Sequence, residues 1–282
     1  MIDTHAHLTD SDFDSDREEV IKRAQDSGVK KIICVLCEFN EKNTLLFKEL
    51  LTNDCIWGAV GVHPHDAEDY EKYSAQLFKI LDLPKVVALG EIGLDYHYKN
   101  PRSPEATSEP CFSKAESLAC QNMHSPKEIQ RQVFEKQLLL AGERNLPVII
   151  HSREASDDCY DILKKFKPAK GIMHCFSGSE KEAEEYLSLG FYLSFAGPVT
   201  FPKGIHSDKN AVKPKEVIKT VPEDRLLLET DCPYLAPQVF RGKRNEPAYI
   251  KYIYEEVARL RNVSTDGLAG TVLKNAAEVF GV

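Results

Sequence analysis

Short apolar runs alternate with amphipathic stretches along the whole chain. Several of the runs are almost continuously apolar, which is typical of parallel strands whose two faces are both covered. The eight runs read MIDTH, KKIICVLC, IWGAVGVH, KVVALGE, LPVIIH, KGIMH, GFYLSFAG and RLLLETD. Stretches with helical periodicity lie between and after them, at 16–27, 129–144, 179–189, 248–261 and 264–280.

This alternation predicts an α/β fold that forms one domain over residues 1–282. About eight strand–helix units over this length are what a (β/α)8 barrel of the TIM type requires. The alternative is an open doubly wound sheet, but no glycine-rich nucleotide-binding turn follows the first strand. We therefore expect a single barrel whose strands all open onto one face at their carboxyl ends.

One interval interrupts the alternation, after the fourth predicted strand. Residues 99–128 are polar, rich in serine, proline and glutamate, and show little periodicity. This composition predicts a surface loop or a disordered insertion, with one short helix near 113–121. The insertion would lie at the carboxyl face of the barrel, and His124 within it is a weak candidate for a metal ligand.

The composition narrows the class of protein. Hydrophobic residues make up 42% of the chain and charged residues 28%, which is typical of a globular fold with a large core. The net charge of −8 argues against binding nucleic acid through overall charge, although it allows a local basic rim around a cleft. The 8 cysteines lack the spacing of a disulfide framework, and Cys34-x-x-Cys37 has no second pair with which to form a zinc site.

The chain shows no targeting or membrane signal. No segment resembles a secretory signal, and none reaches the roughly 18 apolar residues that a membrane span needs. Together with the reduced thiols, this predicts a cytoplasmic protein, with a nuclear location left open and no membrane partner. No obligate protein partner is implied.

Residues that commonly bind metals recur where the apolar runs end. The first run ends in His5-Ala6-His7, and the two histidines would face the same way because alternate strand residues point to one side. In a parallel barrel the carboxyl ends of all strands meet at one face, so ligand-type residues at these ends should converge. The set expected to converge is His5, His7, Glu91, His151, His174 and Asp231.

Each of these residues alone has an ordinary structural explanation, such as a hydrogen-bonded histidine, a helix cap or a turn. Together they would place four imidazoles and two carboxylates in one cleft, where burial is costly without a cation. Their donor atoms suit Zn, Mn, Mg, Co or Ni, and the set is larger than one four-coordinate ion needs. We therefore expect two divalent metal ions, with Glu91 as the bridge between them. Because ligands would lie at positions 5 and 7, we expect that no leader is removed from the chain.

Strand alternation also assigns roles to three neighbours of these residues. Asp3 would point the same way as His5, one step below the metals, and would support the site without being a ligand. Cys175 and Cys232 each follow a ligand directly, so they would face away from it and pack.

Eight segments of the sequence together resemble the TatD-type deoxyribonucleases, which are metal-dependent barrel hydrolases related to the amidohydrolases. The segments are DTHAHL, GVHPH, GEIGLDYH, LPVIIHSREA, MHCFSGS, FAGPVTF, ETDCPYLAP and RGKRNEP. The resemblance runs from Ile2 to the C-terminal helices and is interrupted only by the polar insertion, which departs from the family pattern at the active-site face. It implies hydrolysis of phosphodiester bonds with DNA as the substrate. It also implies two ligand groups, His5, His7, Glu91 and Asp231 for one ion and Glu91, His151 and His174 for the other.

Two-metal chemistry would give Glu91 and Asp231 the catalytic roles. One ion would activate a water and the other would polarise the phosphoryl oxygen, while Asp231 would bind one ion and receive the proton of the water. Asp95 would orient a ligand histidine from behind. The alternative is a hydrolase of the same architecture that acts on a small amide, lactone or phosphate ester, because the ligand set suits that chemistry equally well.

Further polar and aromatic residues on the same face predict contacts with substrate. Arg153 is the leading phosphate ligand because a guanidinium offers bidentate geometry. Lys203, and Arg241 in the basic segment 241–245, would add contacts. His63 and His65 would contact substrate, position a phosphate or hold an additional ion, unless Pro64 only fixes a turn there. Three rings that could stack on a base, although buried packing is their commoner role, are Tyr96, Phe176 and Tyr234.

Overall fold

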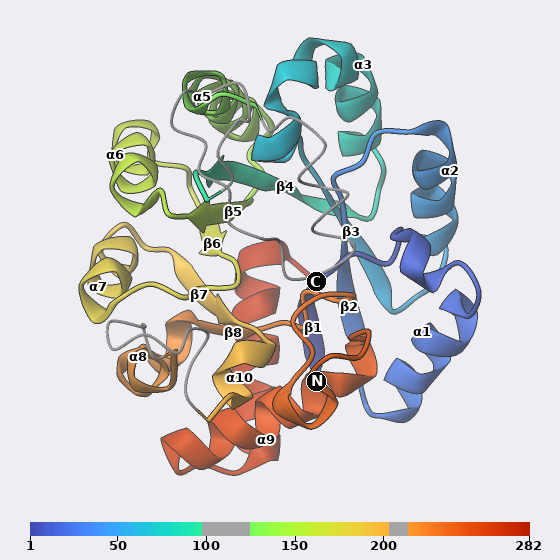
Figure 1. The fold of residues 1–282 in the computed structure, drawn as a ribbon, viewed down its shortest axis with the longest axis vertical. Coiled ribbons are helices and arrows are strands. Elements are labelled where there is room, and N and C mark those ends of the chain that lie inside the picture. Colours follow the sequence, from blue (N-terminus) through green and yellow to red (C-terminus); the bar gives the residue numbers. More distant parts are fainter. Residues whose placement is uncertain (98–124, 203–213) are drawn as a thin grey trace.

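The structure, a computed structural model of the chain, describes residues 1–97, 125–202 and 214–282. Eight parallel strands pair in chain order, and helices surround them, so the predicted (β/α)8 architecture is confirmed (Figure 1). Each predicted apolar run overlaps one strand. The strands are β1 (Ile2–Ala6), β2 (Lys31–Leu36), β3 (Ile56–Val60), β4 (Val86–Asp95), β5 (Val148–Arg153), β6 (Gly171–Met173), β7 (Tyr192–Phe195) and β8 (Leu226–Leu228).

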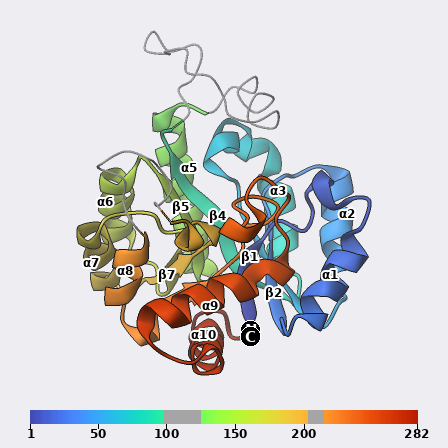
Figure 2. The ribbon, with the colours of Figure 1, turned by 60° about the horizontal axis from the view of Figure 1, so that its bottom comes forward.

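The helices cover the outer face of the sheet, as Figure 2 shows from a second side. Their ends carry the expected capping residues: the Ser179 side chain and Glu182 form a reciprocal capping box at the start of α7, and Asn145 ends α5 in the left-handed conformation. The α-helices of the described residues are α1 (Arg17–Asp26), α2 (Glu41–Leu50), α3 (Tyr70–Leu81), α5 (Lys127–Arg144), α6 (Ser156–Phe166), α7 (Glu180–Ser188), α8 (Pro214–Thr220), α9 (Ile250–Arg261) and α10 (Thr265–Phe280).

The predicted insertion at 99–128 lies mostly outside the described residues, as do the short helix expected near 113–121 and His124. Its predicted end is too late, because α5 already begins at Lys127. Ser125 is buried just before this helix and donates a hydrogen bond from Oγ to the carbonyl of His65 (2.9 Å). The residues that lead into α5 are therefore part of the packed fold.

The barrel closes between its first and last strands through the segment that follows β8. The N–H of Asp231 donates to the carbonyl of His5 (2.9 Å), and the N–H of His7 donates to the carbonyl of Cys232 (2.8 Å). One level below, the Asp3 carboxylate accepts hydrogen bonds from the N–H (2.9 Å) and the hydroxyl (2.6 Å) of Thr230. Asp3 thus supports the closure, in agreement with the role expected for it below the ligand pair.

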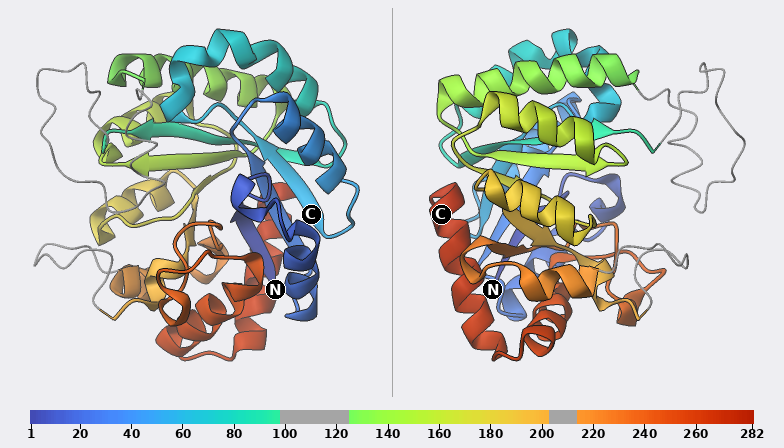
Figure 3. Two further views of the ribbon diagram at one scale, coloured as in Figure 1. Left: turned by 45° about the vertical axis from the view of Figure 1, so that its right-hand side comes forward. Right: turned by 90° about the vertical axis from the view of Figure 1, so that its left-hand side faces the viewer.

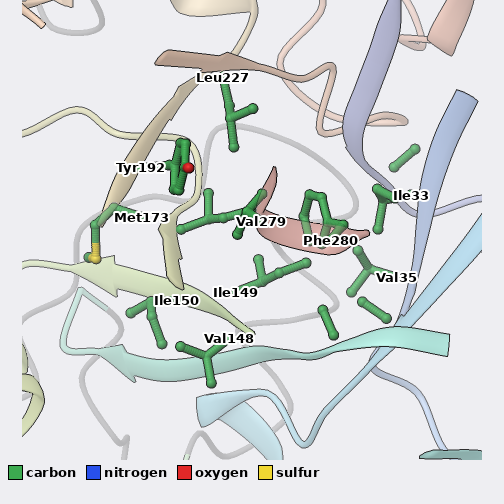
Figure 4. Close-up of a cluster of buried hydrophobic side chains, with 14 of the residues drawn as sticks. Ile33, Val35, Val148, Ile149, Ile150, Met173, Tyr192, Leu227, Val279 and Phe280 are labelled. Atoms are coloured by element: carbon green, nitrogen blue, oxygen red, sulfur yellow. The ribbon is translucent and has the colours of Figure 1, made fainter. Parts of the chain in front are cut away.

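The opposite end of the barrel is closed by the C-terminal helix. Val279 and Phe280, at the end of α10, lie among apolar side chains of the strands, including Ile33, Ile149 and Leu227 (Figure 4). Both chain termini lie at this end, away from the carboxyl ends of β4 and β5 (Figure 3). The carboxyl face is therefore the open end of the barrel, where a site can form. None of the helices described is long and apolar enough to cross a bilayer.

Candidate metal centre

Glu91 lies at the centre of the carboxyl face, and its two oxygens face two groups of histidines. Oε2 lies 3.4 Å from Nε2 of His5 and 3.8 Å from Nε2 of His7. Oε1 lies 2.7 Å from Nδ1 of His151 and 2.8 Å from Nε2 of His174. The carboxylate is almost completely buried, so each oxygen has imidazole nitrogens rather than water as its neighbours. This arrangement suits a carboxylate that is shared between two cations.

The first group comprises His5, His7, Asp231 and Oε2 of Glu91. The Nε2 atoms of His5 and His7 lie 3.1 Å apart, and Oδ1 of Asp231 lies 3.7 Å and 3.3 Å from them. Four donors around a tetrahedral zinc-like ion, with bonds near 2.0–2.1 Å, lie about 3.4 Å from one another. The distances that join the two histidines to each other and to the two carboxylates, 3.1–3.8 Å, are therefore close to the spacing of ligands around one cation.

The second group comprises His151, His174 and Oε1 of Glu91. Both histidines are held from behind by carboxylates: Oδ2 of Asp95 lies 3.1 Å from Nε2 of His151, and Oε1 of Glu229 lies 3.1 Å from Nδ1 of His174. A carboxylate on the far nitrogen fixes the ring orientation and leaves the near nitrogen facing the site, which is the usual support of metal-binding histidines. The expectation that Asp95 contacts a ligand histidine is met.

The charges of the centre are strongly coupled. Burial alone would raise the pKa of Glu91, but the positive charge of His174 and His63 and the hydrogen bonds of His151 and His174 hold it well below its usual range. Burial lowers the pKa of His151, but hydrogen bonds to Asp95 and Glu91 outweigh this and raise it to about 9. The pKa of His174 is raised as well, so protons on His151 and His174 offset the carboxylate charge, and a bound cation would take their place.

The residues present fit a divalent metal. Among the described residues, Nδ1 of His5 and Oε2 of Glu229 are buried without a hydrogen-bond partner, which is costly for a purely structural polar cluster. The described residues form three groups whose donor atoms all lie within 4.8 Å of one another. These groups are His5, His174 and Asp231; His5, His7 and Glu91; and His63, Glu91 and His151. Imidazole nitrogen and carboxylate oxygen are donors that Zn, Mn, Co and Ni accept.

A glycine allows β4 and β5 to carry these groups so close together. Gly93 has φ +140° and pairs with His151 in the ladder. A Cβ at this position would lie 2.0 Å from the carbonyl oxygen of His151. Any other residue would push β5 away and displace His151 from Glu91. The GEIGLD segment therefore supplies Glu91 and Asp95 and also the glycine that lets β5 approach.

Several strand ends differ from those predicted. β4 continues past Glu91 to Asp95 and β5 continues past His151 to Arg153, because the two strands keep pairing. β3 ends at Val60, so His63 precedes a short 3-10 helix (η2, Pro64–Asp69) and is not at a strand end. β8 ends at Leu228, and Asp231 follows it with φ +57°. The ligand-type side chains nevertheless converge, because these short extensions all lie on the same face.

The predicted substrate residues differ in their surroundings. His65 contacts Asp95, with Nε2 lying 2.9 Å from Oδ2. Arg153 is the last residue of β5, and its side chain is exposed. Burial raises the pKa of the Cys175 thiol, next to His174, and the positive charge of Arg153 partly offsets this rise. Arg241 is exposed, and its guanidinium lies over the ring of Phe201 at 4.5 Å. Lys203 lies outside the described residues.

Sequence reasoning underrated His63 and missed Glu229. Nε2 of His63 lies 3.6 Å from Oε1 of Glu91, inside the centre, so Pro64 does not merely fix a turn. Glu229 is fully buried and accepts hydrogen bonds from the N–H of Cys175 (2.6 Å) as well as contacting His174. Its signal was its place two residues before Asp231, at the strand spacing that also relates Asp3 to His5.

The basic segment 241–245 divides into exposed and structural residues. Arg241 and Lys243 are exposed, whereas Arg244 forms a two-pronged salt bridge with Asp16 of the loop before α1 (2.7 Å for each contact). Asn245 is fully buried and donates hydrogen bonds to the carbonyls of Thr230 and Tyr234. Arg244 and Asn245 therefore hold the loop after β8 in place, whereas the predicted phosphate ligand Arg241 is exposed.

Comparisons with known proteins agree with this architecture. A family model described as TatD related DNase matches residues 2–281. A protein of Bacillus subtilis (strain 168), named uncharacterized metal-dependent hydrolase YabD, is 43% identical over 286 residues, covering 100% of this chain and 99% of that protein. The 3'-5' ssDNA/RNA exonuclease TatD of Erwinia amylovora is 32% identical over 289 residues and covered in full, as is this chain. The crystal structure of YJJV, a TatD homolog from Escherichia coli K12, has a TM-score of 0.81 and 30% identity, covering 100% of this chain and 98% of that one.

Proposed function

Because the chain belongs to the TatD-related DNase family of metal-dependent hydrolases, we propose that it is a nuclease that hydrolyses phosphodiester bonds of DNA. The observation that supports this most directly is the position of Glu91 between two groups of imidazoles. A relative that is 32% identical is named a 3'-5' ssDNA/RNA exonuclease, and we extend to this chain its attack on a strand from the 3′ end.

The proposed ligands of one divalent ion are His5, His7, Glu91 and Asp231. Those of the second are Glu91, His151 and His174. Bound divalent cations would supply Lewis-acid activation of a water and of the phosphoryl oxygen. The donor set does not distinguish among Zn, Mn, Mg, Co and Ni, and the spacing of the first group supports a four-coordinate ion.

Asp231 is the proposed acceptor of the proton that the attacking water loses. Hydrogen bonding from His7 and the positive charges of His174 and His5 outweigh burial and hold the pKa of Asp231 below its usual value, so it is ionised. Asp231 follows β8 with φ +57°, and its N–H is fixed by the carbonyl of His5. An ionised carboxylate held beside the reacting centre can accept a proton.

Arg153 and Arg241 are the proposed phosphate ligands of the described residues, and Lys203 and His65 are proposed to add contacts. Arg153 at the end of β5 and Arg241 in the segment after β8 are both exposed, and a guanidinium can bind phosphate oxygens in bidentate geometry. Such cations would provide the local positive rim that an acidic protein needs in order to bind DNA.

The test is a nuclease assay with end-labelled single-stranded DNA and added Mn²⁺, Mg²⁺ or Zn²⁺. We expect shortening from the 3′ end, abolished by a chelator, and a loss of at least about 1,000-fold in Glu91→Gln, in which the bridging charge is removed. Glu135→Gln is the matched control, because Glu135 pairs only with Lys165 on the outer surface in the contacts observed (3.0 Å). Intact DNA combined with hydrolysis of small esters, lactones or amides would overturn the nuclease proposal.

The same variants test the two-ion arrangement. Metal analysis after dialysis should find about two equivalents in the wild type and in Glu135→Gln. Glu91→Gln should lose metal from both positions, because both groups use this carboxylate. Retention of the full metal content in Glu91→Gln would contradict the shared bridge.

A further inference from the structure

Tyr234 lies at the mouth of the barrel beside the metal centre. It follows Asp231 in a tight turn, in which the N–H of Tyr234 donates to the carbonyl of Asp231 (3.0 Å). Its ring meets the ring of His7 edge-on, with 6.0 Å between the centroids. Despite this inward position, 51% of the residue is exposed to solvent. A large aromatic surface is thus left open directly next to the proposed ligand His7.

Tyr234 is held in place by two hydrogen bonds, one at its hydroxyl and one at its backbone carbonyl. The hydroxyl of Tyr234 donates to Oδ2 of Asp10 (3.0 Å), in the loop after β1. The backbone carbonyl accepts a hydrogen bond from Nδ2 of Asn245 (2.7 Å), which is itself fully buried. An aromatic ring held in this way needs little further ordering when it binds a ligand, so more of the contact energy is available for binding.

The surroundings of Tyr234 favour an uncharged, flat ligand. The same loop exposes Leu235 (37%) and Val239 (64%), which add apolar surface. On the other side, burial and the neighbouring Asp10 and Asp66 carboxylates raise the pKa of Glu38, so acidic groups gather at the ends of β1, β2 and β3. Phosphate would be repelled there, whereas the exposed cations lie on the loops after β5 and β8.

The other two rings considered from the sequence do not offer such a surface. Phe176 is buried and packs edge-on against Tyr186 and Phe195. Tyr96 is partly buried, its hydroxyl donates to Asp158 (2.7 Å), and Nζ of Lys127 lies 4.3 Å from the centre of its ring. Only Tyr234 of these three combines exposure, rigidity and contact with the metal centre.

We propose that the ring of Tyr234 stacks on the base of the nucleotide next to the phosphate that is cleaved. This inference rests on the proposed nuclease function and names the residue that would hold the base. A base in a duplex is stacked and paired already, whereas an unpaired base offers a free face to an aromatic side chain. The base would occupy the apolar, acidic side of the mouth, and the phosphates would lie toward Arg153 and Arg241.

The experiment uses an unmodified oligonucleotide and two abasic ones. In one of these the 3′-terminal nucleotide is replaced by an abasic analogue, and in the other the nucleotide before it. Wild-type protein with Mn²⁺ should show a kcat/KM about tenfold or more lower on at least one abasic strand, since stacking of one base on an aromatic ring has an effect of this order. Tyr234→Ala should show a similar loss on the unmodified strand and no further loss on the abasic strands. Tyr234→Phe keeps the ring and should restore the discrimination.

Tyr160→Ala is the matched control, because Tyr160 lies on α6 and contacts Tyr186 of α7 on the outside of the barrel. It should discriminate between the strands as the wild type does. If the wild type cleaves normal and abasic ends equally well, the stacking inference is wrong while the nuclease function stands. If the wild type cleaves no DNA with any metal, the nuclease function itself is wrong.

Discussion

Asp95 holds His151 from the side opposite to the metal centre. Its Oδ2 lies 3.1 Å from Nε2 of His151, while Nδ1 of the same ring lies 2.7 Å from Oε1 of Glu91. The ring is therefore oriented by one carboxylate and presented to another. The same Asp95 oxygen also contacts His65, so one buried charge orders two histidines at the mouth.

We predict that Asp95→Asn weakens binding of the ion held by His151 by about 10- to 100-fold, because loss of such a supporting carboxylate lowers the basicity and order of the ligand. Metal titration of the dialysed protein would measure it. Asp158→Asn is the control, since Asp158 contacts Tyr96 and Arg131 and none of the proposed ligands in the contacts observed. Equal affinities in the two variants would show that Asp95 does not support the site.

Asn245 is predicted to be a strong determinant of stability. Its side chain donates to the carbonyls of Thr230 and Tyr234 and accepts from the N–H of Glu246. Asn245→Ala leaves these groups unpaired and should lower the free energy of unfolding by about 2–4 kcal/mol. Urea denaturation would measure the change. Asn262→Gly, at a helix end where Asn262 already has φ +54°, should alter stability by less than about 1 kcal/mol.

Asp16 gives the fold an acid-sensitive contact far from the metal centre. Hydrogen bonds from Arg244, and also from Arg23, lower the pKa of Asp16 to about 2. Since the folded-state pKa is below the unfolded value near 3.8, the stabilisation is complete above about pH 4 and is lost as the pH falls toward 2. The side chain is 29% exposed, so screening limits the effect to less than about 2 kcal/mol.

The wild type should therefore be more stable than Asp16→Asn at pH 6, and the difference should shrink between pH 4 and pH 3. Urea unfolding at each pH would measure it, with Asp161→Asn, an exposed position on α6, as the reference. A difference that stays constant down to pH 3 would argue against the Arg244 contact.

Replacing Arg241 and replacing Arg244 by alanine should affect different properties: the first DNA binding, the second stability. Arg241→Ala should leave stability within about 0.5 kcal/mol of the wild type, weaken binding of single-stranded DNA, and reduce the slope of its salt dependence by about one. Arg244→Ala should lower stability by roughly 1–2 kcal/mol, because it breaks the two-pronged contact with Asp16 and uncovers Phe13. Equal salt slopes for wild type and Arg241→Ala would remove Arg241 from the binding surface.

Much of the fold and of the centre could be predicted because both follow from one simple periodicity. Continuous apolar runs identify the eight strands, and parallel strands must share a carboxyl face. His5 and His7 are two residues apart, so strand geometry alone turns both toward the interior. The order of the strands then suffices to predict that residues as distant in sequence as His7 and Asp231 lie close together.

The remaining contacts depend on pairings that leave no local pattern. Asp16 and Arg244 are separated by 228 residues, and nothing near either distinguishes a salt bridge from two solvated charges. The extension of β4 to Asp95 depends on how far β5 stays alongside it. Glu229 was the exception, since its spacing from Asp231 follows the same rule that identified His5 and His7.

The hydrogen bonds between His5 and Asp231 and between His7 and Cys232 have a consequence for how the protein is made. The first strand leaves the ribosome long before the segment that completes its hydrogen bonding. Until residue 232 has been synthesised, the sheet has an open edge and the first group of donors lacks Asp231. A nascent chain therefore cannot bring together the complete set of proposed ligands before residue 232 has left the ribosome.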